Sequence, residues 1–140
     1  MLSDADRELV DVASNAIRRR YREDWQEVGA ALRVRSGKIF SGVNLDAYLG
    51  RMAVCAEAVA LGQAINEAGE VGIDTIVAVR HPRPAEARKI AVVSPCGACR
   101  ELIWDYDPNA RVIVPGEGGP TIALIGELLP NKYNRDRGDR

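Results

Sequence analysis

Three cysteines and one glutamate are the residues of this chain whose types and spacing could support chemistry. Cys96 and Cys99 form a C-x-x-C pair, and Cys55 stands 41 positions before Cys96 and two ahead of Glu57. Side chains three residues apart lie on one face of a helix, so the sulfur atoms of Cys96 and Cys99 could share a metal ion. Because an odd number of thiols cannot pair completely, we expect a role other than disulfide formation.

Three interpretations of the thiols are open. A dithiol redox pair suits a C-x-x-C at a helix start but leaves Cys55 unexplained. A structural zinc ion needs four protein ligands, and the sole histidine, His81, is the candidate for the fourth. A catalytic zinc ion uses three protein ligands and keeps its fourth position for water.

Glu57 favours the catalytic zinc site. An acid in the first turn of a helix is ordinary, but that alone does not explain its place beside Cys55. Two positions correspond to about 200 degrees around a helix, so Cys55 and Glu57 can face one site only beyond the helix end. A second helix starting at Cys96 would bring its own positive N-terminus to the same point, where a zinc ion with three thiolates carries net negative charge.

The elements that must position these residues are predicted from hydrophobic periodicity and turn residues. The expected helices cover 4–20, 53–67 and 96–104, with a helical turn at 126–130, and the expected strands cover 28–35, 38–44, 75–79, 90–94, 111–114 and 121–125. Interleaved strands and helices predict a three-layer α/β/α sandwich, whose five-stranded sheet is mixed because its first two strands form a hairpin. We expect a single domain over residues 1–133 and a disordered charged tail over 134–140.

The composition limits the kind of partner that the chain can have. Its 140 residues carry a formal net charge of −1, which provides no general attraction to phosphate and argues against a nucleic-acid partner. No apolar run reaches the length of a membrane span, and the first residues lack the order of a signal peptide, so we expect a cytoplasmic protein without a membrane partner. A domain of this size needs no metal to hold its core, so a bound metal would serve chemistry.

Five motifs occur in order along the chain. They are Val28-Gly29-Ala30-Ala31-Leu32, Gly42-Val43-Asn44, Cys55-Ala56-Glu57, Pro95-Cys96-Gly97-Ala98-Cys99-Arg100 and Leu128-Leu129-Pro130-Asn131-Lys132-Tyr133. Together they resemble the cytidine deaminase family in its three-cysteine form, which has a V-G-A-A strand, a G-x-N segment, a two-part zinc signature and an L-L-P-x-x-[FY] end. The resemblance extends over most of the chain.

The resemblance implies a zinc-dependent hydrolytic deaminase of a free aminopyrimidine nucleoside, cytidine or deoxycytidine first, acting in pyrimidine salvage. Zn²⁺ would be held by Cys55, Cys96 and Cys99, and Glu57 would move protons between water, the ring nitrogen and the departing ammonia. The implied substrate contacts are Asn44, Asp46, Ala56, Ser94, Pro95 and Tyr133. The resemblance also implies a homotetramer or homodimer, in which Tyr133 closes the pocket, often that of a neighbouring subunit.

Three features depart from the family pattern. Asp46 stands where the pattern N-x-E-N-A has a glutamate. The aromatic residue that stacks on the pyrimidine is replaced by Gln26, with Trp25 displaced by one position. The arginine that commonly follows C-A-E is Ala58 here, and Arg100 is the candidate to replace it.

A second branch of the superfamily, the blasticidin S deaminases, is also similar to this chain. It shares the G-V-N segment and the L-L-P-x-x-Y end and lacks the full N-x-E-N-A pattern. The eleven-residue interval from Asn44 to Cys55 matches the cytidine enzymes better. We therefore keep blasticidin S, or another aminoheterocycle, as the alternative substrate, and a structural zinc or dithiol redox module as the alternative that is not an enzyme.

Overall fold

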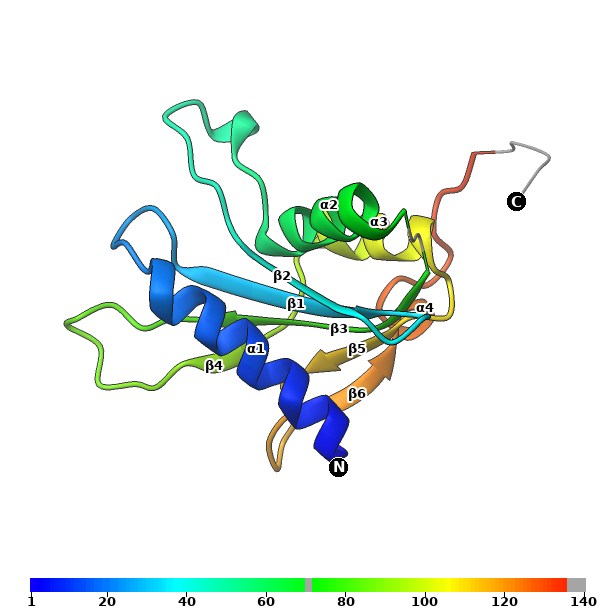
Figure 1. The fold of residues 1–140 in the computed structure, drawn as a ribbon, viewed down its shortest axis with the longest axis horizontal. Coiled ribbons are helices and arrows are strands. Elements are labelled where there is room, and N and C mark those ends of the chain that lie inside the picture. The colour runs from blue at the N-terminus through cyan, green and yellow to red at the C-terminus, as the bar shows by residue number, and fades with distance from the viewer. Residues whose placement is uncertain (70–71, 136–140) are drawn as a thin grey trace.

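The computed structural model describes residues 1–69 and 72–135, which form three layers (Figure 1). The helices are α1 (Asp4–Arg20), α2 (Ala56–Ala68), α3 (Gly97–Tyr106) and the short α4 (Ile125–Leu128), with a 3-10 turn, η1, at Gly50–Met52. Helix α1 packs on one face of the sheet and the other helices pack on the opposite face, each side with its own buried cluster. The predicted sandwich is confirmed, and residues 136–140 of the predicted tail lie outside the described residues.

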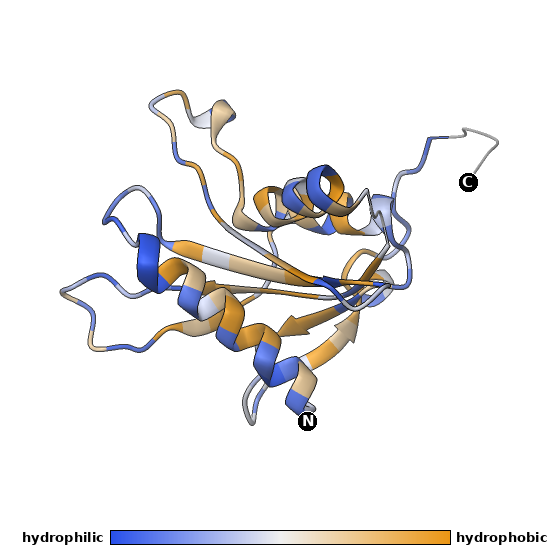
Figure 2. Ribbon diagram, in the orientation of Figure 1, coloured by the Kyte–Doolittle hydropathy of each residue, from blue (hydrophilic) through white to orange (hydrophobic). Residues whose placement is uncertain are grey.

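The sheet is mixed, as predicted. Its strands are β1 (Val28–Val34), β2 (Ile39–Val43), β3 (Ile73–Arg80), β4 (Ala91–Val93), β5 (Arg111–Val114) and β6 (Thr121–Leu124). The main order is β2-β1-β3-β5-β6, in which β3 and β5 are parallel and the other neighbours are antiparallel. Figure 2 shows that the strands are hydrophobic along most of their length, as expected for a sheet covered on both faces.

The short strand β4 makes the sheet six-stranded, so the expected count of five was wrong. Strand β5 pairs with residues 75–77 of β3, and β4 pairs with residues 78–80. Because β1 occupies the other edge of β3 over its whole length, β4 and β5 must share one edge. The extra strand satisfies backbone groups that β5 is too short to reach.

Two glycines determine how closely the helices approach the sheet. A Cβ at Gly29 of β1 would lie 2.5 Å from the carbonyl oxygen of Ala13 in α1. A Cβ at Gly42 of β2 would lie 2.8 Å from Cγ1 of Val59 in α2. The close approach of α1 to β1 therefore requires glycine at position 29, and the close approach of α2 to β2 requires glycine at position 42.

The helix ends follow local cap chemistry. The predicted cap of α1 is confirmed, since Ser3 and Asp6 exchange hydrogen bonds as a capping box. Helix α2 begins at Ala56, later than predicted, because Cys55 is extended and residues 50–52 form η1. It ends at Gly69, which is left-handed with φ 65° as a C-terminal glycine commonly is. No helix in the described part of the chain is long and apolar enough to cross a membrane.

Candidate active site

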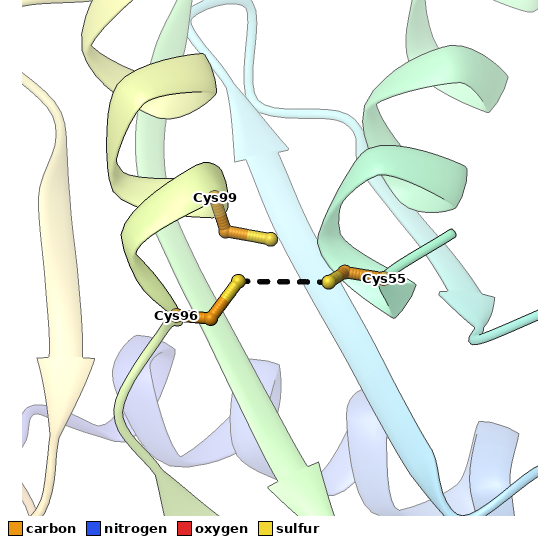
Figure 3. A group of neighbouring side chains, drawn as sticks. All are labelled: Cys55, Cys96 and Cys99. Atoms are coloured by element: carbon orange, nitrogen blue, oxygen red, sulfur yellow. Dashed lines mark hydrogen bonds between the residues drawn. The ribbon is translucent and has the colours of Figure 1, made fainter. Parts of the chain in front are cut away.

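The three thiols meet where two helices begin. Cys55 is the N-cap of α2, Cys96 is the N-cap of α3, and Cys99 lies in the first turn of α3. Figure 3 shows their side chains pointing toward one another from the two helix starts. The sulfur atoms of Cys55 and Cys96 are 3.6 Å apart, and all three sulfurs lie within 4.8 Å of one another.

This spacing fits a zinc ion. Zinc–sulfur bonds of about 2.3 Å at the tetrahedral angle place two sulfur ligands about 3.8 Å apart. The metal-ligand group found among the described residues consists of these thiols alone. His81 is not part of it, and its ring instead stacks on Tyr21 with centroids 3.9 Å apart. The donor set is therefore that of a zinc ion with three protein ligands, and it lacks the fourth ligand of a structural site.

The surroundings give the thiols different proton affinities. Burial raises the pKa of Cys55 and that of Cys99, and the nearby Glu57 raises that of Cys99 further. Burial also acts against the Cys96 thiolate, but backbone N–H groups of Cys99 and Ala98 lower its pKa overall. A divalent cation between the sulfurs would favour the thiolate form of all three, with release of their protons.

Glu57 lies beside this cluster in the first turn of α2. Glu57 is buried, with only 5% of its surface exposed. Burial raises the pKa of the carboxyl, and this is opposed by its own backbone N–H and by the Cys99 thiol. A buried carboxyl with a raised pKa exchanges protons nearer to neutral pH than a surface glutamate does.

A cavity of about 330 Å³ opens in front of Glu57. Its lining includes seven of the ten predicted site residues: Asn44, Asp46, Cys55, Ala56, Glu57, Ser94 and Cys96. The rest of the wall is apolar: Val28, Leu45, Ala53, Val54, Ala78 and Val93. The predicted residues Pro95, Cys99 and Tyr133 do not line it; Pro95 and Cys99 are buried, and Tyr133 is 74% exposed.

Asn44 is mainly engaged with the protein itself. Its Oδ1 accepts hydrogen bonds from the backbone N–H groups of Glu27 and Val28 at 2.9 and 3.0 Å. Its Nδ2 donates to the carbonyl oxygen of Trp25 at 2.8 Å. Since an amide has two acceptor positions and two N–H bonds, one N–H remains for a ligand. Asn44 thus fixes the segment that leads into β1.

The segment between β2 and α2 projects from the domain (Figure 1), and it contributes Leu45, Asp46, Ala53 and Val54 to the cavity lining. Asp46 is exposed, and its Oδ1 accepts a hydrogen bond from the N–H of Ala47 at 2.7 Å. Tyr48, which the sequence did not single out, is 95% exposed and meets Trp25 edge to face with centroids 5.3 Å apart. The signal for Tyr48 was its type and its position between Asn44 and Cys55.

Within the described residues, Arg100 donates hydrogen bonds to backbone carbonyl groups and not to a sulfur atom. Its Nε donates to the carbonyl oxygen of Pro95 at 2.9 Å, and its Nη1 donates to that of Leu128 at 3.1 Å. Arg100 was the candidate to replace the arginine missing at Ala58, but its guanidinium binds backbone carbonyl groups instead of the thiolates. Arg100 holds the backbone just before Cys96.

Comparisons with known proteins agree with this geometry. A family model described as the cytidine and deoxycytidylate deaminase zinc-binding region matches residues 3–114. A blasticidin-S deaminase of Bacillus cereus is 48% identical over 136 residues, or 96% of each chain. A probable cytidine deaminase of Dictyostelium discoideum is 30% identical over 109 residues, which are 78% of this chain and 69% of that protein. A crystal structure of cytidine deaminase from Burkholderia pseudomallei aligns with a TM-score of 0.73 and 25% identity, over 94% of this chain and 100% of that one.

The fold and the thiol cluster beside Glu57 define a zinc-dependent hydrolase. The chain belongs to the cytidine and deoxycytidylate deaminase family. It is a hydrolytic deaminase acting on C–N bonds, and its cofactor is zinc, as the sequence predicted.

Proposed function

We propose that the protein removes the exocyclic amino group from a cytosine ring carried by a free small molecule. The observation that supports this most is that Glu57 shares one cavity with the thiols of Cys55 and Cys96, while Cys99 completes the cluster. The cavity volume of about 330 Å³ lies in the range of small-molecule sites. The near-neutral charge of the chain supports a free substrate over a nucleic acid.

In the proposed reaction one water is consumed and one ammonia is released, as the C–NH₂ of the ring becomes C=O. The three thiols would hold the zinc ion, which when bound would supply a Lewis acid that makes water nucleophilic at neutral pH. Glu57 accepts a proton from the water, delivers it to the ring nitrogen and later gives a proton to the departing ammonia. Its burial and raised pKa suit a carboxyl that must be an acceptor when ionised and a donor when protonated.

The backbone at Ser94 is the proposed acceptor for the substrate amino group. The resemblance to the deaminase family implies that the backbone around Ser94 and Pro95 receives this group. The Pro95 carbonyl already accepts a hydrogen bond from Arg100, whereas Ser94 lines the cavity. Ser94 is therefore the better placed of the two.

Blasticidin S is the substrate that the combined observations favour. The 48% identity to a blasticidin-S deaminase extends over 96% of both chains. Asn44 has one free N–H and Asp46 is one methylene shorter than the glutamate of N-x-E-N-A, which weakens the sugar contacts expected for a nucleoside. Cytidine or deoxycytidine is the second candidate, supported by the cytidine deaminases among the relatives.

Ammonia release from blasticidin S, cytidine, deoxycytidine and cytosine tests the proposal. We expect turnover of blasticidin S or of a nucleoside, and no release from any of the four by zinc-loaded protein would refute the deaminase assignment on cytosine rings. Glu57→Gln should abolish turnover and leave zinc content unchanged, because the glutamate is not a ligand in this proposal. Glu67→Gln, an exposed position on the same helix, is the matched control and should keep full activity. Loss of zinc from Glu57→Gln would instead make Glu57 a ligand.

We also propose a cytoplasmic homotetramer or homodimer. Four large hydrophobic side chains are exposed on the projecting segment: Leu45, Tyr48, Leu49 and Met52. Such a patch beside a cavity supports burial against another subunit, and Tyr133, exposed away from its own cavity, supports a contact with a neighbouring one. Light scattering after size-exclusion chromatography tests this, and a monomer at micromolar concentration would contradict it. Free thiols support a reducing compartment.

A further inference from the structure

Arg100 joins two parts of the chain that are distant in sequence. Through Nε it holds the carbonyl oxygen of Pro95, which belongs to the peptide bond that leads into Cys96. Through Nη1 it holds the carbonyl oxygen of Leu128, the last residue of α4, which no bond within that short helix would satisfy. One planar guanidinium therefore fixes the start of α3 and the end of α4 relative to each other.

The chain beyond α4 is attached to α3 a second time, by Lys132. Its Nζ lies 3.0 Å from a carboxylate oxygen of Glu101 and 2.9 Å from one of Asp105. The ammonium also lies 5.0 Å from the ring centroid of Trp104. Only 5% of the Lys132 side chain is exposed, which is rare for a lysine and indicates a built socket.

The turn before Lys132 directs this side chain back to α3. Asn131 has φ 53°, in the left-handed region that asparagine tolerates better than most residues. Helix α3 thus holds the later chain at two successive places. Residue 100 binds residue 128, and residues 101, 104 and 105 contact residue 132. The C-terminal segment, defined here as residues 128–132, runs along α3 and does not line the cavity.

We infer that Arg100 is a positioning residue of the thiol cluster and that Lys132 acts on the cluster through it. The hydrogen bond to the Pro95 carbonyl oxygen sets the orientation of the peptide bond between Pro95 and Cys96. Without the guanidinium, this peptide bond can rotate and the thiol of Cys96 loses its fixed position. Lys132 keeps Leu128 in place, and Leu128 keeps the guanidinium in place. This inference rests on the ligand set of the proposed function.

Zinc release measures the role of Arg100 without any substrate. Zinc-loaded protein is mixed with an excess of a chromogenic chelator, and the rate of metal transfer is followed. Because partners behind metal ligands typically change affinity by about 10- to 100-fold, we expect Arg100→Met to release zinc about 10- to 100-fold faster. The rate of zinc release from Arg100→Lys should lie between that of Arg100→Met and that of the unmodified protein, because one ammonium group cannot reach both carbonyl oxygens.

A matched control separates positioning from a general loss of stability. Arg111 is also an arginine with two side-chain partners, Asp6 and Thr75, but it lies in β5 away from the thiols. Arg111→Lys should lower the urea midpoint and leave zinc release unchanged. The d–d absorption of the cobalt-substituted protein gives a second readout, because it reports the geometry of the thiolates. It should change in Arg100→Met and not in Arg111→Lys.

Lys132→Met tests the second step. Coupling through a packed network typically changes an equilibrium by about 2- to 30-fold, and we expect zinc release to accelerate in that range. If Lys132 acts through Arg100, the variant with both changes should release zinc no faster than Arg100→Met alone. Lys38→Met, at an exposed position in the β1–β2 turn, should have no effect.

Different results overturn different parts. Arg100 does not position the cluster if Arg100→Met releases zinc at the rate of the unmodified protein and its cobalt-substituted form has an unchanged d–d spectrum. If the effects of Arg100→Met and Lys132→Met multiply, Lys132 does not act through Arg100. If the unmodified protein binds no zinc, or keeps it when Cys55 and Cys96 are replaced by serine, the ligand set of the proposed function fails instead.

Discussion

Replacing Gly42 with alanine should displace the helix that carries Cys55 and Glu57. The new Cβ would lie 2.8 Å from Cγ1 of Val59 and 2.9 Å from the backbone nitrogen of Ala60, both in α2. An ordinary carbon–carbon contact is about 3.5 Å or more, so the helix must retreat by about 0.7 Å. Overpacking of this kind costs about 1 to 3 kcal/mol of unfolding free energy.

The displacement acts on catalysis through the start of α2, because Cys55 and Glu57 would move relative to Cys96 and Cys99 in α3. Metal sites tolerate changes of about 0.2 Å in ligand distance, and a misplacement of about 1 Å can cost 100-fold in rate. We therefore expect Gly42→Ala to lower kcat by about 10-fold or more and to speed the loss of zinc. Urea unfolding, zinc content and initial rates of ammonia release measure the three effects on one preparation.

Gly62 provides the matched control on the same helix. A Cβ at Gly62 meets nothing within 4 Å, so Gly62→Ala should stabilise α2 by about 0.5 to 1 kcal/mol and leave kcat unchanged. If Gly42→Ala keeps the stability, zinc content and kcat of the unmodified protein, the close contact does not set the position of α2. Equal loss of kcat in Gly62→Ala would also refute the reasoning.

Two further substitutions test hydrogen bonds that hold the site and the fold. Asn44→Ala leaves two backbone N–H groups without their acceptor, so we expect a loss of about 2 kcal/mol in urea unfolding together with a raised KM, and an unchanged midpoint would contradict this. Burial acts against ionisation of Asp107, but hydrogen bonds from Arg35 and two backbone N–H groups hold its pKa below that of an ordinary aspartate. Ionised Asp107 therefore stabilises the fold above about pH 4, and this contribution is lost as pH falls through the lowered pKa. Asp107→Asn should lose less unfolding free energy between pH 6 and pH 3 than the unmodified protein, and equal losses would exclude the role.

The sequence predicted the layers of the fold because they depend on local periodicity and turn chemistry. Helix α2, for example, ends at Gly69 as the sequence indicates. The strand at residues 90–94 was predicted, but its place as a sixth strand of the sheet was not, because its pairing depends on how much of β3 the distant β5 covers. Long-range geometry of this kind leaves no periodic signal in the chain.

The candidate site was predicted in its chemistry more fully than in its contacts. The thiols and Glu57 could be assigned from residue types and motif order. The partners of Asn44 and Arg100 could not be predicted. They are backbone groups up to 28 positions away, and every residue type carries such groups, so the sequence does not mark them. Tyr133 is 74% exposed and does not line the cavity, a placement that the motif alone does not indicate.

The two N-cap ligands place the metal centre at a junction between rigid and variable structure. Cys55 and Cys96 start helices that are packed on the sheet, whereas much of the cavity wall comes from the segment before α2. The thiols and Glu57 are thus carried by the helix starts, while a large part of the wall that would face a bound molecule is carried by the segment before α2. Engineering of this enzyme for a new amino-bearing ring can therefore concentrate its libraries on Leu45, Asp46, Ala53 and Val54 and leave the helix starts untouched.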